Sequence, residues 1–307
     1  MNDKAIRVLE YSKIINTLKE QAGSEMTRKV ISELKPFQDI RVIREALEET
    51  GEAVLLITHK GPLPLGNFYD IGGLINLAKK GGCLTMADLL KILYNLTITI
   101  NVVNFLKGDL PPLPILQEMG QVLEIYPSLR EDIDRCILSE DEMADNASSE
   151  LRSIRRSIVR QNEALKTKMN HILNSSDNKT ILQDAIVTMR DGRYVIPVKA
   201  EHRGKVPGIV HDQSASGATL FIEPQVIVNL NNELRQLEAD EQAEIARILK
   251  DLTERVAEHY DGLRNNQELL VQMDLITAKG KLSSLQRGEC PEINEEGILD
   301  LKQARHP

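Results

Sequence analysis

The residues of this sequence that could do chemistry are cations, and they gather between positions 190 and 205. Only Asp191 and Glu201 are acidic in this stretch, so its net charge is positive although the whole chain of 307 residues carries a formal charge of −8. Lysine and arginine bind phosphates without base-specific geometry, so the stretch predicts contact with a nucleic-acid backbone. The alternative, ordinary solvated positions on an exposed sheet, stays open. The five cations are Arg190, Arg193, Lys199, Arg203 and Lys205.

No established catalytic pattern accompanies these cations. The Walker A pattern GxxxxGK[ST] is absent, because neither Gly-Lys pair is followed by Ser or Thr. The six histidines form no HxH, HExxH or Cys/His cluster, so we expect neither a metal nor a cofactor in this chain. A hydrolase centred on His211-Asp212, or on Ser214 and Ser216, remains as a third hypothesis, although the chain has no GxSxG elbow there. We therefore expect no catalytic residues and no enzyme activity in this chain.

The cations lie in a segment that predicts a small β-sheet. Asp191-Gly192 is a strong two-residue hairpin signal, because glycine readily adopts positive φ. Alternation along 193–199 places Tyr194, Ile196 and Val198 on the buried face of the second strand. The other face then carries Arg193, Val195, Pro197 and Lys199. The predicted strands are 185–190, 193–199, 208–212 and 219–223, with a turn of small residues at 213–217.

Two amphipathic helical stretches flank this segment and must position it. Apolar residues recur at spacings of three, four and seven on the first side and mainly at three and four on the second, which predicts one apolar seam along each helix. Glu241 stands where the second seam expects an apolar residue. We expect an antiparallel pair, whose second arm would extend about 60 Å at roughly 1.5 Å per residue. The seams are Leu151, Ile154, Ile158, Leu165, Met169 and Ile172, then Leu230, Leu234, Leu237, Ile245, Ile248, Leu252, Val256, His259 and Leu263.

The remaining segments predict a helical body. Aromatic residues make up only 3% of the chain and Trp is absent, which favours aliphatic helix packing over a β-sandwich. Thr85 is the expected cap of the longest of these helices. Proline and glycine mark the breaks, and a short extended piece is expected at 297–301. The predicted helices are 5–22, 40–57, 71–80 and 86–106.

Composition also bears on the compartment. The three cysteines are isolated, which predicts no disulfide framework and a reducing environment. The sequence contains no run of about 18 apolar residues and no signal peptide at its start, so we expect a cytoplasmic protein without membrane contact. The last residues form neither a helix stop nor a polar tail, and we expect the natural chain to continue beyond Pro307.

The segment from Val187 to Lys199, VTMRDGRYVIPVK, and the segment from Val206 to Pro224, VPGIVHDQSASGATLFIEP, closely resemble the bacterial MutS-two family. This family is a branch of the MutS mismatch-repair ATPases without the mismatch-reading domains. The resemblance extends from the first helix to the final residues ARHP, which in this family lead into the ATPase domain. It therefore covers the whole chain.

The resemblance implies an architecture and several activities. The fold would be mainly α, a helical core with a long antiparallel lever that bears a small β-rich clamp at its tip. The whole protein would be a homodimeric ATPase using ATP and Mg²⁺, with a nuclease-linked C-terminal domain absent here. Its partners would be branched or other DNA, or ribosomal RNA within stalled ribosomes. The expected parts are core 1–138, first arm 139–180, clamp 181–225, second arm 226–265 and core 266–307.

Two functional hypotheses from different classes follow. In the preferred one the clamp grips nucleic acid or a ribosomal surface, while the absent ATPase drives opening and closing. In the other, the chain is a coiled-coil interaction scaffold whose charges serve solubility and whose seam is partly open to a partner helix. The sequence does not choose between DNA and the ribosome.

Overall fold

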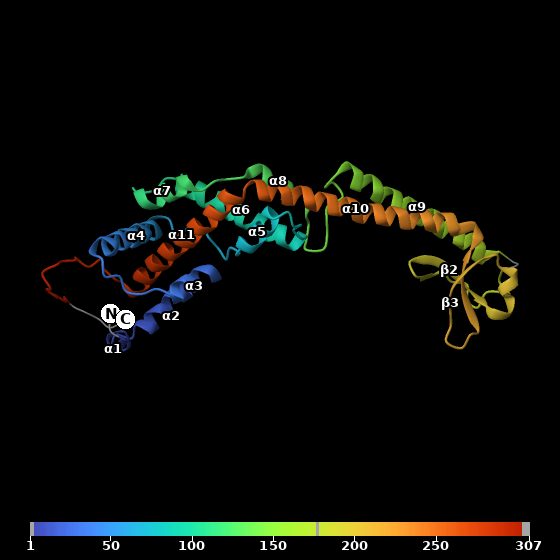
Figure 1. Ribbon diagram of the computed structural model, residues 1–307, viewed down its shortest axis with the longest axis horizontal. Helices are drawn as coiled ribbons and strands as arrows, with labels where there is room; N and C mark the ends of the chain where they lie inside the picture. The colour runs from blue at the N-terminus through green and yellow to red at the C-terminus, as the bar shows by residue number, and fades with distance from the viewer. Residues whose placement is uncertain (1–2, 176–177, 303–307) are drawn as a thin grey trace. The chain divides into compact units, whose positions relative to one another are not determined.

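The computed structural model describes residues 3–175 and 178–302 and is mainly helical. The chain divides into two compact units. Unit 1 comprises Met1–Glu142 with Lys250–Pro307, and unit 2 comprises Met143–Leu249. Figure 1 shows the helices of unit 1 in blue, cyan, green and orange-red and the strands of unit 2 in yellow and light orange.

The described part of unit 1 contains helices and no strand, and its core lies between α11, α4 and α6. α11 approaches α4 so closely that a Cβ built on Gly280 would lie 2.7 Å from the Cβ of Ala53, so glycine is required there. A buried carboxylate, Asp274, accepts hydrogen bonds from the backbone of Gly23 and Ser24, both at 3.0 Å. The helices are α1 Asp3–Val8, α2 Tyr11–Gln21, α3 Glu25–Ser32, α4 Ile40–His59, α5 Gly72–Lys79, α6 Met86–Leu106, α7 Pro114–Val122, α8 Pro127–Cys136 and α11 Tyr260–Gln286.

Three of the four helices predicted for this unit are confirmed within about two residues, namely α4, α5 and α6. The fourth is interrupted at Glu10, whose φ of 52° separates α1 from α2. The short helices α3, α7 and α8 were not predicted, because each spans too few turns to show a clear apolar period. Residues 297–301, predicted to be extended, belong to no helix or strand, so their extended form stays a prediction.

Helix α6 carries the most apolar sequence of the chain. Its predicted cap is confirmed, because Thr85 and Asp88 form a reciprocal capping box. Among the described residues, α6 is the one helix that is long and apolar enough to cross a membrane. Such a helix was not predicted from the sequence, because only uninterrupted apolar runs were considered. Half of its apolar window is buried, and α7 and α8 pack against it. Its composition is therefore that expected of a core helix.

Unit 2 contains α9 (Ser149–Asn174), the first part of α10 (Val228–Glu258) and a four-stranded sheet. The two helices run antiparallel, because Ser148 bonds Glu244, Arg155 bonds Glu241 and Gln161 bonds the carbonyl of Leu230. Glu241, the exception in the predicted seam, accepts from Arg155 at 2.7 Å. The seam therefore changes from apolar to polar at this level. Figure 1 shows α9 beside α10 with the strands at one end of the pair.

The sheet is antiparallel with strand order β1-β2-β4-β3. Asp191 and Gly192 form the predicted hairpin turn with φ values of 50° and 71°. A shared core joins the sheet to the helix pair through Leu165 and Met169 of α9, Ile196 of β2 and Leu234 of α10. The strands are β1 Thr188–Arg190, β2 Arg193–Lys199, β3 Gly208–Gln213 and β4 Thr219–Pro224, with short 3-10 helices at Ala200–Lys205 and Gln225–Ile227.

The second predicted seam does not continue through a single helix. α10 ends at Glu258, and α11 begins at Tyr260 after His259 leaves helical geometry. The ring of His259 stacks on Tyr126 at 4.3 Å between centroids, and Leu252, Val256 and Leu263 are buried within unit 1. The periodic pattern persisted across this break because both helices bury one face.

A charged cluster at the start of α9 gives a pH-dependent stability. Hydrogen bonds from Arg247 and Ser148 lower the pKa of Glu244 to about 2. Burial of the carboxylate acts in the opposite direction but is outweighed. Because the pKa of Glu244 is lower in the folded protein than in the unfolded chain, its ionised carboxylate stabilises the fold at pH values above its ordinary pKa of 4.5. This stabilisation is lost as the pH falls from about 4.5 towards about 2. Ser148 also caps α9 by accepting from the N–H of Leu151 at 2.9 Å.

We expect Glu244→Gln to destabilise the α9–α10 pair by about 2 kcal/mol at pH 7, because it removes charge-assisted hydrogen bonds. Amide hydrogen exchange in α9 at pH 7 and pH 3 measures this, and the difference between variant and parent should shrink at the lower pH. Glu238→Gln, at an exposed position of the same helix, is the matched control. An equal effect of both variants would contradict the assignment.

Candidate nucleic-acid interface

The five predicted cations all belong to the sheet of unit 2 or the 3-10 helix after β2, but their surroundings differ. Arg190, at the end of β1, has a side chain that is 38% exposed and donates from Nε to Asp212 at 2.9 Å. Its guanidinium also lies 4.0 Å from the ring centroid of Phe221. Exposed ion pairs contribute little to stability, so this arginine can exchange Asp212 for a phosphate.

Arg193 is held inside the fold. Its side chain is only 17% exposed, and its Nη1 donates to both carboxylate oxygens of Glu223, at 2.8 and 3.1 Å. Its Nη2 donates to Asn232 at 2.7 Å. Glu223 is completely buried, so a phosphate contact by Arg193 would leave that carboxylate without its charged partner. The geometry therefore favours a structural role for this residue.

The other three cations surround the 3-10 helix at Ala200–Lys205. Lys199 donates to the carbonyl of Thr180 at 3.3 Å. Arg203 donates to the carbonyls of Val206 and Gly208, each at 3.2 Å. Lys205 is exposed and has no ion pair among the residues that the structure describes. These contacts involve no carboxylate, so the positive charge of all three is available to an anion.

The His211-Asp212 pair of the hydrolase hypothesis is divided between two sites. His211 Nε2 lies 2.6 Å from Oε2 of Glu223, whereas Asp212 pairs with Arg190. The register of β3 against β4 shifts between Val210 and Asp212, so His211 lies at the irregularity. Ser214 accepts from the N–H of Thr219 at 3.1 Å and so closes the turn. Within the described ranges, no three His, Cys, Asp or Glu residues form a metal-binding group.

The predicted alternation of β2 is wrong for one face. Tyr194 and Ile196 pack against the helix pair as expected. Val195, assigned to the exposed face, is also completely buried, and Pro197 is buried too. β2 lies between β1 and β4, and the Arg193–Glu223 cluster covers its other side. A central strand with both faces covered shows no clear polar alternation.

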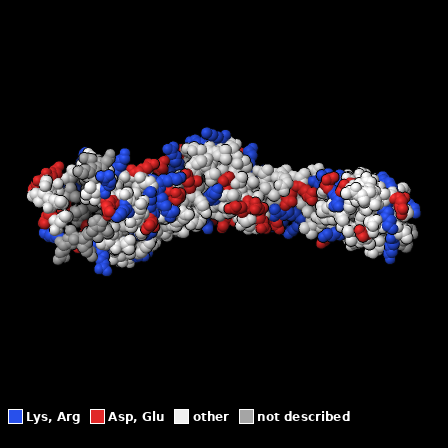
Figure 2. Space-filling model, turned by 90° about the horizontal axis from the view of Figure 1, so that it is seen from below, with Lys and Arg blue, Asp and Glu red and all other residues white. Residues whose placement is uncertain are grey.

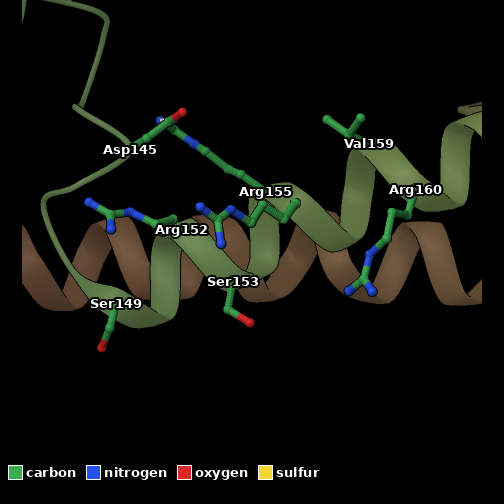
Figure 3. Close-up of a pocket in the computed structure, with 8 residues that line it drawn as sticks. Asp145, Ser149, Arg152, Ser153, Arg155, Val159 and Arg160 are labelled. Carbon is green, nitrogen blue, oxygen red and sulfur yellow. The ribbon is translucent and has the colours of Figure 1, made fainter.

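Sequence reasoning missed a second group of cations, on α9. A groove of about 740 Å³ runs along the first three turns of this helix. Its lining contains four arginines and one carboxylate, and the spacing of Arg152, Arg156 and Arg160 at every fourth position was the signal that could have revealed it. The lining residues are Asp145, Ser149, Arg152, Ser153, Arg155, Arg156, Val159 and Arg160 (Figure 3).

The charges of unit 2 form no continuous basic surface on the face shown in Figure 2, where acidic side chains lie among the lysines and arginines. A contact with a polyanion would therefore be local, through the sheet cations or through the α9 groove. The fold defines a mainly helical protein in which an antiparallel helix pair packs against a small four-stranded sheet.

Comparison with known proteins gives the family. No family model matches the chain, but curated bacterial relatives match it over its whole length. The chain is 42% identical over 309 residues to endonuclease MutS2 of Alkaliphilus oremlandii, and 44% identical over 309 residues to that of Alkaliphilus metalliredigens. It is 44% identical over 310 residues to endonuclease MutS2 of Clostridioides difficile. The chain thus belongs to the MutS2 family, as its resemblance implied, and it spans about 39% of the length of these relatives.

Proposed function

We propose that this chain is a nucleic-acid-binding part of a MutS2 protein and that the sheet of unit 2 contacts the phosphate backbone. The observation that carries the proposal is the set of sheet cations whose charge no buried carboxylate neutralises: Arg190, Lys199, Arg203 and Lys205. The relatives are named endonucleases, and such an enzyme acts on nucleic acid. Branched DNA and ribosomal RNA have the same phosphate backbone chemistry, so the proposal includes both as ligands.

In the whole protein, the remainder of the chain would supply the catalytic chemistry. We infer that ATP and Mg²⁺ bind outside these 307 residues and that two copies assemble through the missing part. The helix pair would then act as a lever and the sheet as a clamp. This chain would bind without catalysing a reaction, and the protein would work in the cytoplasm.

A protein-interaction scaffold is the second candidate, and exposed apolar side chains on the sheet favour it. Met189 on β1 is 50% exposed and Ile209 on β3 is 45% exposed. These strands are the two outer strands of the sheet, with β2 and β4 between them. Apolar side chains on two separate edges form a weaker protein-binding surface than one continuous apolar patch would. The cations therefore remain the stronger indication of what this unit binds.

We expect the combined variant Arg190→Gln, Lys199→Gln, Arg203→Gln, Lys205→Gln to bind DNA and RNA at least about tenfold more weakly at 0.1 M salt. The slope of log affinity against log salt should fall by up to about one per lost phosphate contact. Fluorescence anisotropy with labelled duplex DNA, branched DNA and structured RNA measures both quantities. The charge-matched control is Lys29→Gln, Lys35→Gln, Lys80→Gln, Lys107→Gln, at exposed positions of unit 1. Equal affinity and slope for the two variants would reject the interface and favour the scaffold.

A further inference from the structure

The α9 groove contains a row of arginines that follows the helix axis at a slight incline, which we define as the arginine row: Arg152, Arg156 and Arg160. Four residues of helix rise about 6 Å, so the three Cα positions follow one another along the helix at this interval. All three residues are exposed. Among the described residues, Arg152 and Arg156 have no hydrogen-bond or ion-pair partner for their side chains, and Arg160 bonds only Ser157, at 3.0 Å.

The one carboxylate that lines the groove is already engaged. Asp145, the carboxylate of the groove, accepts from Nη1 of Arg155 at 2.6 Å. Arg155 also pairs with Glu241 and donates to the carbonyl of Met143. Figure 3 shows Arg155 reaching towards Asp145, while Arg152 and Arg160 extend elsewhere. The carboxylate of the groove therefore pairs with Arg155 and not with the arginine row.

Helix stability does not explain the row. Like charges four residues apart on a helix repel each other and destabilise it. Arg152 also lies at the end of the first turn, where the helix dipole disfavours a cation. The fold thus carries three charges that weaken α9 and form no ion pair among the residues described. A ligand with regularly spaced negative charges would supply that compensation.

The chemistry of the groove favours a nucleic-acid backbone over an acidic protein. Guanidinium groups match phosphate geometry in a bidentate way, and serine hydroxyls are common phosphate donors. The groove offers both, through the arginine row and through Ser149 and Ser153. Its one apolar member is Val159, at 57% exposure, and no aromatic side chain lines it. Protein interfaces usually need buried aromatic or large apolar anchors, which are missing from this lining.

We propose that the arginine row binds consecutive phosphates of a nucleic-acid strand, as a second contact separate from the sheet. The inference rests on the proposed function, because it assumes that the ligand of the MutS2 protein is nucleic acid. The row lies on the first half of α9, whereas the sheet packs against the second half, around Leu165, Met169 and Leu173. The centres of the two contacts, Arg156 and Met169, are about 20 Å apart along the helix. Each can therefore be removed without altering the other.

The test compares Arg152→Gln, Arg156→Gln, Arg160→Gln with the charge-matched control Lys29→Gln, Lys35→Gln, Lys107→Gln. Fluorescence anisotropy with a labelled 30-base-pair DNA duplex and a labelled RNA of about the same length gives affinity and salt slope. We expect the arginine-row variant to bind at least about tenfold more weakly than the control, with a salt slope lower by about two to three. Arg152→Lys, Arg156→Lys, Arg160→Lys should retain most of the slope, and far-UV circular dichroism checks that α9 stays folded.

The outcomes separate this inference from the proposed function. If the arginine-row variant binds like its control while the sheet variant loses affinity, the row is rejected and the sheet interface stands. If the parent chain binds neither DNA nor RNA, both proposals are rejected. If polyglutamate binds the parent as tightly as DNA does, and the row variant loses both, the row is a site for an acidic protein and the inference is overturned.

Discussion

Replacing Glu223 by alanine is expected to destabilise the sheet of unit 2 by about 3–5 kcal/mol, the largest effect of any single substitution there. The carboxylate is completely buried and holds Arg193, Asn231 and His211 together. Alanine would leave the guanidinium of Arg193 largely buried without a counter-charge, and breaking one side of a buried ion pair costs this much. The residues that lose their common partner come from β2, β3 and α10, so the effect should spread through the whole sheet.

Amide hydrogen exchange is the appropriate measurement, because a chain with two units need not unfold in one step. Protection of β2 and β4 should fall sharply in Glu223→Ala, while protection of α4 and α11 in unit 1 stays unchanged. Glu233→Ala, at an exposed position of α10, is the control. The double variant Glu223→Ala, Arg193→Ala should lose less than the sum of the single effects. If the losses of stability are additive, Glu223 and Arg193 are not energetically coupled. Arg193 would then again be a candidate for binding nucleic acid.

The same carboxylate makes the sheet sensitive to acid. Burial opposes its ionisation, but hydrogen bonds from Asn231, His211 and Arg193 outweigh burial and lower the pKa of Glu223 below its ordinary value. The resulting stabilisation is present above the unfolded pKa and is lost as pH falls below about 4.5. Loss of β2 and β4 protection in this range should be smaller in Glu223→Gln, whose side chain does not titrate.

The second large effect is expected at Gly208. A Cβ built on this residue would lie 2.1 Å from the backbone oxygen of Glu223 and 2.9 Å from its carbonyl carbon. The obstacle is backbone in the paired strand, so a side-chain rearrangement cannot relieve the clash. We expect Gly208→Ala to separate the start of β3 from β4 and to cost about 3 kcal/mol, the upper end for overpacking.

Gly204 provides the matched control for this prediction. It lies four residues earlier, and a Cβ built there meets no atom within 4 Å. Gly204→Ala should therefore change the exchange rates of β3 and β4 little. Equal effects of the two substitutions would show that the β3–β4 approach is looser than described. Because Arg203 bonds the carbonyl of Gly208, the first substitution should also weaken nucleic-acid binding, if the sheet is the interface.

These contacts change how the sheet cations are interpreted. The five look alike in the sequence, but Arg193 is committed to Glu223 while Lys199, Arg203 and Lys205 face only carbonyl groups or solvent. A binding assay on Arg193 alone would report loss of the fold as well as loss of a contact. The assignment of nucleic-acid contacts therefore rests on the other four residues and stays a prediction until the affinity measurements are made.

The sequence by itself determined the local features whose signals act over a few residues. The Asp191-Gly192 turn needs positive φ, the Thr85 cap needs Asp88, and the long amphipathic helices need one apolar face, so each could be located from residue type and spacing. The long motif around residues 187–224 identified the family, which whole-chain identity to MutS2 relatives confirms. Short helices such as α3 escaped, because two turns carry too little periodicity.

The tertiary structure alone decided which charges are free. Pairing of Glu223 with Arg193 and His211 joins three strands, and no spacing along the chain predicts it. Burial of Val195 likewise depends on what covers the far side of β2. The periodic seam could not show where α10 ends, because a helix buries one face in the same way whichever unit it packs against. A charge in sequence becomes a binding group only when the fold leaves it without an internal partner, and that depends on contacts between residues far apart in the chain.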